Sequence, residues 1–382
     1  MAEPELGGAD GGSASLHGQG PVFVVGPMGS GTTLMRLVLD SHSRLALAPE
    51  TGLARLILAH EQVPFWKFGD EWYGRLGLTR DELDAELRAF YGGLYGRFAE
   101  QRGAVRWGDK TPFHTWHVPR LARVFPDAVF VGTVRHPGAV ALSLRERFGF
   151  TWQAGVRHWV RSTTELVYRG SELGDRFLLC RYEDVVTDPE PVLRELFDWL
   201  GEPWEDRVLA FHEVHRDRGT DSEVEGRTRS DQPMDTSRIA RWTNAVEEPE
   251  RALLHQQTHA LAALLGYDVA LPTPTRSLRA GLPGFRMLAT GEDLAALRCC
   301  HDGIDWVNRP RPTLENRPMR SQDLRALREA AARADGRRSP ATAYGWAARQ
   351  TPRWLRPVVA ALPAPIRDRA REIRREHRYR HA

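Results

Sequence analysis

A glycine-rich stretch near the start of the chain has the residue types of an anion-binding loop. GPMGSGTT, residues 26–33, follows an apolar run and precedes a segment with apolar residues at helical spacing. The N–H groups of such a turn, together with the positive end of the helix dipole, attract phosphate or sulfate. Gly26, Gly31 and Thr33 match a Walker loop, GxxxxGK[ST], but Thr32 replaces its lysine. The sequence therefore predicts an anion site that lacks the charge reaching the β- and γ-phosphates of ATP or GTP.

Two later segments offer charges for the same anion. WGDKTP, residues 107–112, contains Lys110, one of only two lysines among the 53 basic residues. Arg135 ends an apolar run in TVRHPGAVALS, where the ligands of parallel α/β sheets bind, and Ser143 follows about two helical turns later. Arg135 also replaces the acid that holds magnesium in nucleotide-hydrolysing enzymes. Alternatively, Lys110 is an ordinary surface lysine, and Arg135 only caps an element or forms a salt bridge.

Strand-like and helical patterns alternate along the first two thirds of the chain. We expect strands at 21–26, 128–134 and 177–184 and a short extended piece at 44–51, because these runs are short, apolar and rich in β-branched residues. Helical periodicity follows residue 32, begins again at Pro137, and covers 189–202 and 250–268. This order predicts an α/β fold with a central parallel sheet between layers of helices.

The chain divides into three parts by composition. Residues 1–20 are rich in glycine, without basic or apolar blocks, and predict a disordered leader rather than a signal peptide. Residues 21–270 carry the α/β pattern, and their 61–101 segment predicts an aromatic-rich helical insertion that either lines an acceptor pocket or packs as core. Residues 271–382 predict a mostly helical extension that ends in a basic tail.

Composition excludes several classes of protein. No apolar run approaches the roughly 20 residues of a membrane-spanning helix. The three cysteines, Cys180, Cys299 and Cys300, form neither a disulfide framework nor a zinc motif, which favours the cytoplasm. Net charge is +3 overall, and residues 351–382 alone carry nine arginines against three acids, so bulk charge does not make the main body a nucleic-acid-binding surface. The basic tail is either solvated or contacts an anionic membrane surface or acidic protein.

Taken together, the motifs resemble those of a known family. GPMGSGTTLMRLVLDSH, PET (49–51), WGDKTP, FPDAVFVGTVRHPGAVALS and RYEDVVTDP occur in the order found in PAPS-dependent sulfotransferases, most closely the branch of tyrosylprotein sulfotransferases and bacterial relatives. The resemblance covers residues 21–268. It implies a P-loop α/β domain that uses 3′-phosphoadenosine 5′-phosphosulfate (PAPS) as donor and needs no metal.

The resemblance also implies a set of donor-binding residues. The loop residues, which would cradle the 5′-phosphosulfate, are Met28, Gly29, Ser30, Gly31, Thr32 and Thr33. Arg135 and Ser143 would hold the 3′-phosphate, and Tyr182 would lie near the nucleotide. Ser230 and Arg241 match later donor-binding positions more loosely. The family commonly has arginine at the position of Gly29; its absence bears on donor affinity, and Arg36 is a candidate to compensate.

For catalysis, the resemblance assigns Glu50 as the base that accepts the acceptor hydroxyl's proton. Such a carboxylate needs a pKa raised toward neutrality, which partial burial would give. Lys110 would place its charge on the bridging oxygen as the donor bond breaks. Because histidine is the base in another branch of the family, the alternatives near the motifs are His42, His114, His117 and His136.

We therefore expect a sulfotransferase that modifies a hydroxyl group of a small-molecule acceptor, such as a natural product, lipid or glycoside. One alternative is a P-loop kinase or NTPase, against which the missing Walker lysine and magnesium acid argue. The other is a non-catalytic nucleotide-binding protein on the same fold, since a fold alone does not guarantee chemistry.

Overall fold

The computed structural model describes residues 20–61, 72–219 and 231–275. With the exception of Glu61 and Trp72, all of these residues belong to one compact unit. The predicted leader up to residue 19, Ser230 and the predicted extension beyond residue 275, including its basic tail, lie outside the described residues.

A five-stranded parallel sheet forms the centre of this unit, with the strand order β2-β3-β1-β4-β5. The strands are β1 (Val22–Val25), β2 (Leu45–Pro49), β3 (Arg106–Lys110), β4 (Val129–Val134) and β5 (Phe177–Arg181). All six residues of β4 and all five of β5 are buried, which explains their mostly apolar character. The predicted parallel sheet is confirmed, and each predicted strand is present with its ends moved by a few residues.

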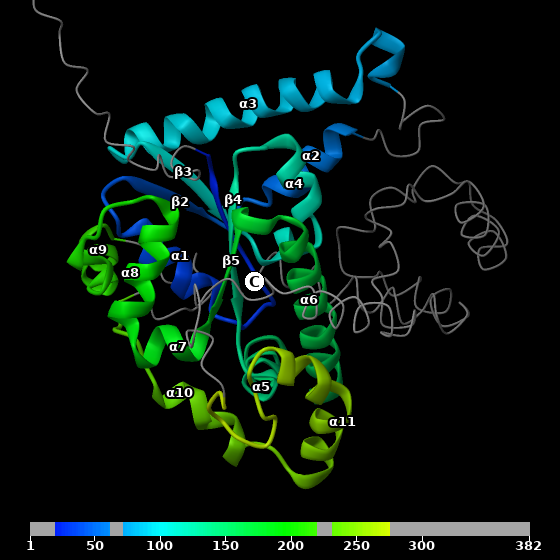
Figure 1. Ribbon diagram of the computed structural model, residues 1–382, viewed down its shortest axis with the longest axis vertical. Helices are drawn as coiled ribbons and strands as arrows, with labels where there is room; N and C mark the ends of the chain where they lie inside the picture. Colours follow the sequence, from blue (N-terminus) through cyan, green and yellow to red (C-terminus); the bar gives the residue numbers. More distant parts are fainter. Residues whose placement is uncertain (1–19, 62–71, 220–230, 276–382) are drawn as a thin grey trace, which may run out of the picture. The chain divides into compact units, whose positions relative to one another are not determined.

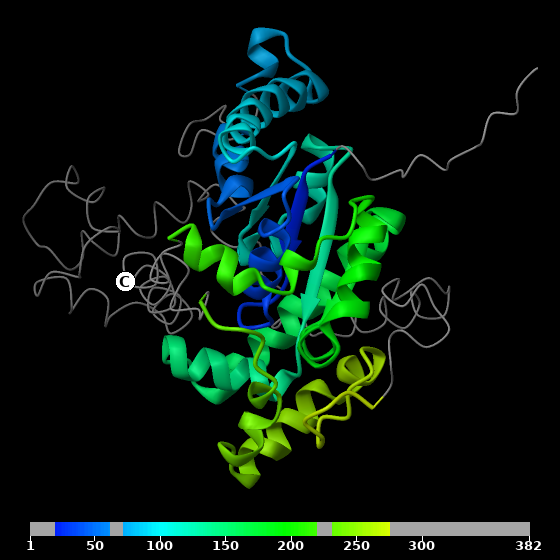
Figure 2. The same cartoon turned by 90° about the vertical axis from the view of Figure 1, so that its left-hand side faces the viewer.

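Helices cover both faces of the sheet, as Figures 1 and 2 show. The main ones are α1 (Thr32–Asp40), α2 (Leu53–Glu61), α3 (Arg80–Gln101), α4 (Val118–Val124), α5 (Pro137–Phe148), α6 (Trp152–Glu172), α7 (Tyr182–Thr187), α8 (Pro189–Leu200), α9 (Phe211–Asp217), α10 (Ser237–Ala240) and α11 (Glu248–Leu264). On one side α1, α8 and α9 share a hydrophobic core with the sheet. On the other side α5, α6 and α11 pack together. The three-layer architecture expected from the alternating pattern is confirmed.

From residue 72 on, where the structure describes the segment 61–101, it is largely one long helix, α3, which begins with a capping box formed by Thr79 and Glu82. Tyr91 and Tyr95 are buried, whereas the side chain of Phe90 is 58% exposed. The aromatic residues Phe65, Trp66 and Phe68 lie outside the described residues. The aromatic side chains of the segment therefore divide between core and surface.

The strand β3 was not expected, because RWGDK is too polar to be read as a strand. It pairs with both β1 and β2, with Gly108 opposite Val22 on one side and Leu47 on the other. A Cβ added to Gly108 would lie 2.4 Å from the Val22 carbonyl oxygen, so this position needs glycine. The register places Lys110 opposite Pro49. The consequence is that the WGDKTP and PET motifs end side by side at the carboxyl edge of the sheet.

Among the described residues, no helix has both the length and the apolar character needed to cross a membrane. In the same ranges, no group of three or more His, Cys, Asp or Glu side chains is arranged to hold a metal ion.

Candidate active site

The glycine loop joins β1 to α1, as predicted, and two of its glycines have a left-handed backbone. Gly29 has φ +84° and Gly31, the N-cap of α1, has φ +98°. A Cβ on Gly31 would lie 2.7 Å from the ring of Tyr182, so this glycine is required by space as well as by conformation. The N–H groups in the first turn of α1 have no partner within the helix. Because N–H groups point toward the N-terminal end of a helix, they are directed toward the loop.

Two of the predicted loop residues use their polar groups on protein partners. Met28 donates its N–H to Nε2 of His158, at 3.2 Å. The buried Ser30 hydroxyl donates to the Pro27 carbonyl oxygen and contacts Oγ1 of Thr133, at 2.7 and 2.9 Å. Met28 and Ser30 thus fix the shape of the loop in this structure.

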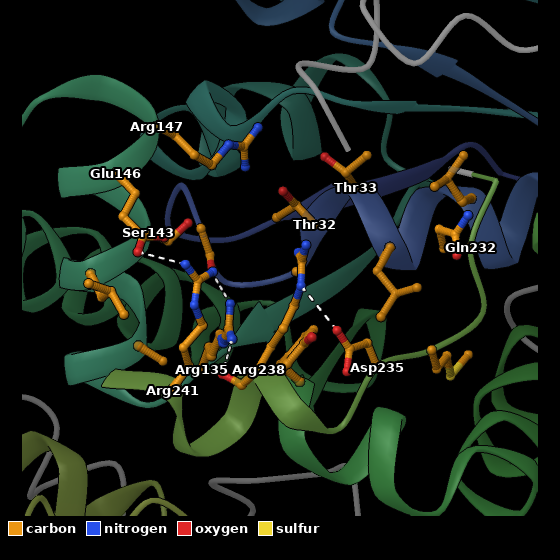
Figure 3. Close-up of a pocket in the computed structure, with 18 of the residues that line it drawn as sticks. Thr32, Thr33, Arg135, Ser143, Glu146, Arg147, Gln232, Asp235, Arg238 and Arg241 are labelled. Carbon is orange, nitrogen blue, oxygen red and sulfur yellow. Dashed lines mark hydrogen bonds and ion pairs between the residues drawn. The ribbon is translucent and has the colours of Figure 1, made fainter. Parts of the chain in front are cut away.

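Beside the loop is a cavity of about 270 Å³, drawn in Figure 3. Eight of the residues predicted to bind the donor line it: Gly29, Gly31, Thr32, Thr33, Arg135, Ser143, Tyr182 and Arg241. They come from the glycine loop, α1, the end of β4, α5, α7 and the turn that follows α10. Four arginines, Arg135, Arg147, Arg238 and Arg241, stand against two carboxylates in the cavity wall, Glu146 and Asp235, so its formal charge is +2.

Arg135 is the most constrained of these arginines, with 8% of its surface exposed. It donates one hydrogen bond to the Gly29 carbonyl oxygen at 3.4 Å and another to the Arg238 carbonyl oxygen at 2.8 Å. Its guanidinium carbon lies 4.1 Å from the centre of the Tyr182 ring, a cation–π contact. Burial raises the pKa of Tyr182, and Arg135 opposes that rise. Arg135 therefore connects the loop, α7 and α10. Among the described residues, no carboxylate forms a salt bridge with it.

Sequence reasoning missed Glu146 on α5 and four further polar residues of the cavity wall: Arg147, Gln232, Asp235 and Arg238. A signal existed for Arg147, because it follows Ser143 by four residues on α5 and so shares its helix face. The other three come from a segment about 100 residues beyond Arg135, and no local pattern indicated that they meet it. Arg241, which was predicted, forms an ion pair with Glu146 at 2.9 Å.

The two predicted catalytic residues meet at the sheet edge. Lys110 Nζ lies 2.6 Å from Oε1 of Glu50 and donates to Oγ1 of Thr33 at 3.3 Å. Lys110 is 1% exposed, so its charge is held in a fixed place by its surroundings. The positive charge that Thr32 does not supply thus reaches the loop from β3. The partial burial expected of Glu50 is not found, because 56% of its side chain is exposed.

A buried carboxylate, Asp109, ties the segments of Glu50 and Lys110 together. Its Oδ1 accepts from Thr111 Oγ1 at 2.9 Å and contacts His114 Nε2 at 2.6 Å. Its Oδ2 accepts from the hydroxyl groups of Thr51 and Tyr95. Asp109 is the residue before Lys110, and Thr51 is the residue after Glu50. Hydrogen bonds to a fully buried carboxylate are strong, so this network fixes the spacing of Glu50 and Lys110.

The histidines considered as alternative bases make structural contacts. His42 stacks on Phe197 and bonds the Pro203 carbonyl oxygen at 2.7 Å. His114 belongs to the Asp109 network. Burial lowers the pKa of His117 to about 4.

His136 is the fourth of these histidines and caps α5 by accepting from the Gly138 N–H. Burial lowers its pKa to about 3. No histidine of this group has a described contact with Glu50 or Lys110.

Arg36 does not compensate for the missing loop arginine, so that expectation was wrong. Its side chain is buried, with NH1 donating to the Leu47 carbonyl oxygen at 3.1 Å and lying 3.6 Å from Asp40. These contacts place it in the core between α1 and β2. Asp40 follows Arg36 at the i,i+4 spacing of a helical ion pair, a signal that was present in the sequence.

The fold and this edge of the sheet define an α/β transferase with an anion-binding glycine loop and a lysine–carboxylate pair. A family model described as "Sulfotransferase family" matches residues 21–206. Protein-tyrosine sulfotransferase 1 of Mus musculus is 30% identical over 262 residues, which cover 65% of this chain and 69% of the mouse protein. The corresponding protein of Danio rerio is 28% identical over 263 residues, 65% of this chain and 72% of that protein. The chain belongs to the sulfotransferase family and is a transferase of sulfur-containing groups.

Two solved structures are similar in fold. The sulfotransferase domain from the Curacin biosynthetic pathway has a TM-score of 0.46 at 21% identity, over 65% of this chain and 98% of that domain. The sulfotransferase domain of the Synechococcus PCC 7002 olefin synthase has a TM-score of 0.47 at 23% identity, over 65% of this chain and 96% of that domain.

Proposed function

We propose that the protein transfers the sulfuryl group of PAPS to a hydroxyl group of a small-molecule acceptor, with Glu50 as base and Lys110 as the stabilising cation. The observation that carries this proposal is the contact chain Glu50–Lys110–Thr33. Thr33 also lines the cationic cavity, so it is common to the catalytic pair and the donor pocket. A reacting sulfuryl group placed at Thr33 would lie between the donor pocket and the base.

The cavity residues fit the two anionic ends of PAPS. We assign the 5′-phosphosulfate to the glycine loop, where Thr32 and Thr33 begin α1, because helix N-termini attract anions. We assign the 3′-phosphate to Arg135 and Ser143. A Cβ on Gly29 would lie 3.3 Å from Ser143 Oγ, which shows how closely the loop approaches α5. The net charge of +2 on the charged side chains of the cavity wall complements a polyanionic donor.

When bound, PAPS supplies an activated sulfuryl group whose bond to phosphate is broken in the reaction. The acceptor oxygen forms a bond to sulfur in line with the bridging oxygen, and 3′,5′-ADP leaves. Glu50 accepts the proton of the acceptor hydroxyl. Lys110, buried and fixed, stabilises the negative charge that develops on the bridging oxygen. The exposure of Glu50 gives the acceptor access to the base.

A small acceptor is our choice over a protein tyrosine, although the named animal relatives are protein-tyrosine sulfotransferases. The support is the aromatic character of the segment around α3, whose Tyr95 reaches the Asp109 network beside the catalytic pair. A direct comparison of phenolic, aliphatic and tyrosine-peptide acceptors, with sulfated product measured, separates these classes. Preferential sulfation of the peptide would overturn the small-molecule assignment.

The donor is tested by calorimetric titration with 3′,5′-ADP, 5′-ADP and Mg-ATP. We expect preferential binding of 3′,5′-ADP and a loss of about 10-fold to 100-fold in affinity in Arg135→Ala, because a charge-assisted bidentate contact is removed. Preferential binding of Mg-ATP would contradict the proposal and support a kinase or NTPase. Binding of 3′,5′-ADP without sulfuryl transfer to any acceptor would support a non-catalytic nucleotide-binding protein.

A further inference from the structure

The cavity wall that faces the glycine loop is formed in part by α10 and the residues before it. Asp235 and Arg238 of this wall both line the cavity. In Figure 3 the side chain of Arg238 extends from α10 toward Thr32, at the start of α1. A guanidinium therefore approaches the loop from a segment that lies about 200 residues later in the chain.

The loop itself offers no side chain at Gly29. The backbone of Gly29 is left-handed, at φ +84°, a conformation that side-chain-bearing residues rarely adopt. A Cβ there would meet both Cβ and Oγ of Ser143 at 3.3 Å. In this chain, a cation that replaces the missing side chain at Gly29 therefore comes from another element.

Arg238 is held in place before any ligand binds. Its Nε lies 3.5 Å from Oδ2 of Asp235. Asp235 is itself fixed, because its Oδ1 accepts from the N–H of Ser237 at 2.9 Å. The Arg238 carbonyl oxygen accepts from Arg135 at 2.8 Å, which anchors α10 to the end of β4.

Arg238 and Tyr182 line the same cavity. The buried Tyr182 phenol has a raised pKa because of desolvation, and both Arg135 and Arg238 oppose the rise. Tyr182 packs against Gly31 of the loop, so a charge that acts on its hydroxyl also lies near the loop. The side chain of Arg238 is 40% exposed, which leaves its guanidinium open to a ligand.

Two other cavity arginines, Arg135 and Arg241, are engaged differently. Arg135 donates to two backbone carbonyl oxygens, and Arg241 pairs with Glu146 at 2.9 Å. The Arg238–Asp235 pair is longer, at 3.5 Å, and a planar guanidinium keeps further N–H groups for a second anion.

We infer that Arg238, oriented by Asp235, binds the 5′-phosphate end of the donor and supplies the guanidinium that the loop lacks at Gly29. This inference rests on the proposed donor. The guanidinium of Arg238 donates two charge-assisted hydrogen bonds to the phosphate, on the side opposite the N–H groups of α1. Asp235 acts through Arg238 and is a positioning residue.

The test is calorimetric titration of the full chain with 3′,5′-ADP, 5′-AMP and 3′-AMP. We expect Arg238→Ala to weaken 3′,5′-ADP and 5′-AMP by the same factor, about 10-fold to 100-fold, and to leave 3′-AMP unchanged. Arg238→Lys keeps the positive charge but not the planar set of donors of a guanidinium, so it should recover part of the lost affinity. Asp235→Asn should cause a smaller loss of affinity for the same two ligands.

The matched control is Arg194→Ala. Arg194 is 47% exposed and pairs with Glu190 on α8, as Arg238 pairs with Asp235, but it does not line the cavity. Unchanged affinity in Arg238→Ala, or a loss confined to ligands with a 3′-phosphate, would overturn the inference while leaving the proposed donor intact. If the wild type does not bind 3′,5′-ADP, the proposed donor and this role of Arg238 both fall.

Discussion

The proposed donor cavity and the proposed catalytic pair, Glu50 and Lys110, occupy the same edge of the sheet but are built in opposite ways. Four arginines line the cavity, and two of them, Arg238 and Arg241, have side chains that are 40% and 58% exposed. The catalytic pair has one lysine, 1% exposed, and its segment is fixed by a fully buried carboxylate. Binding is thus shared among several cations, whereas the chemistry depends on single groups. Single substitutions should therefore reduce binding gradually and turnover steeply.

Of the substitutions at positions other than Glu50, Lys110→Met should have the largest effect, and that effect is on turnover. Methionine keeps most of the stem volume but removes the charge that meets the developing oxyanion, so kcat should fall by about 10²-fold to 10³-fold. The measurement is sulfuryl transfer under saturating donor, with melting temperature as the control for folding. A variant that folds and retains more than a third of wild-type kcat would remove Lys110 from the proposed role.

Asp109→Asn should have the next largest effect. An amide nitrogen cannot accept from the hydroxyl and imidazole donors that now surround the carboxylate, so the spacing of Glu50 and Lys110 is disturbed. We expect kcat to fall by about 10-fold to 100-fold and the free energy of unfolding by about 1.5–3 kcal/mol.

The affinity of Asp109→Asn for 3′,5′-ADP separates positioning from general damage to the fold. This residue does not line the donor cavity, so the affinity should stay within about threefold of wild type. A loss of donor affinity as large as the loss of kcat would show that the two halves of the site are not independent.

The smallest effect on turnover is expected at His136, whose role concerns the pH dependence of stability. Burial lowers its pKa to about 3, so the folded protein resists its protonation while the unfolded chain takes up the proton near pH 6.5. Its stabilising contribution is complete above about pH 6.5 and is lost as pH falls toward 3. Glu183, whose carboxylate accepts a hydrogen bond from the backbone N–H of His136, has a pKa raised by burial and acts in the opposite direction.

Comparing the wild type with His136→Asn isolates the contribution of His136 to the pH dependence of stability. Asparagine keeps an acceptor for the Gly138 N–H but does not titrate. Denaturant unfolding between pH 7 and 4 should show a slope shallower than that of wild type by up to about 1.4 kcal/mol per pH unit. Equal slopes would mean that His136 is not the buried neutral group described above.

Local patterns in the sequence were sufficient for most of the fold. The apolar runs of β1, β4 and β5 and the glycine spacing of the loop are signals contained within a few residues. The strand β3 was missed because its burial comes from pairing on both sides rather than from apolar residues.

The site was only partly predictable for a similar reason. Motifs identified Glu50, Lys110 and Arg135, but the partners of these residues come from distant segments. The contact of Arg135 with Arg238 spans about 100 residues, and that of Asp109 with Tyr95 depends on how α3 lies against β3. Arg36 was wrongly assigned because its orientation into the core depends on tertiary packing around α1.

The account is tested most directly by measuring two quantities in one variant, Glu50→Gln. Glutamine can still contact Lys110 but cannot take the acceptor's proton. We predict that kcat falls by about 10²-fold to 10⁴-fold while the Kd for 3′,5′-ADP stays within about threefold of wild type. Glu86→Gln, which removes an exposed carboxylate on α3, should change neither quantity. Unchanged kcat, or a rise in Kd that accounts for the whole loss of activity, would contradict the division between a donor cavity that binds and a Glu50–Lys110 pair that reacts.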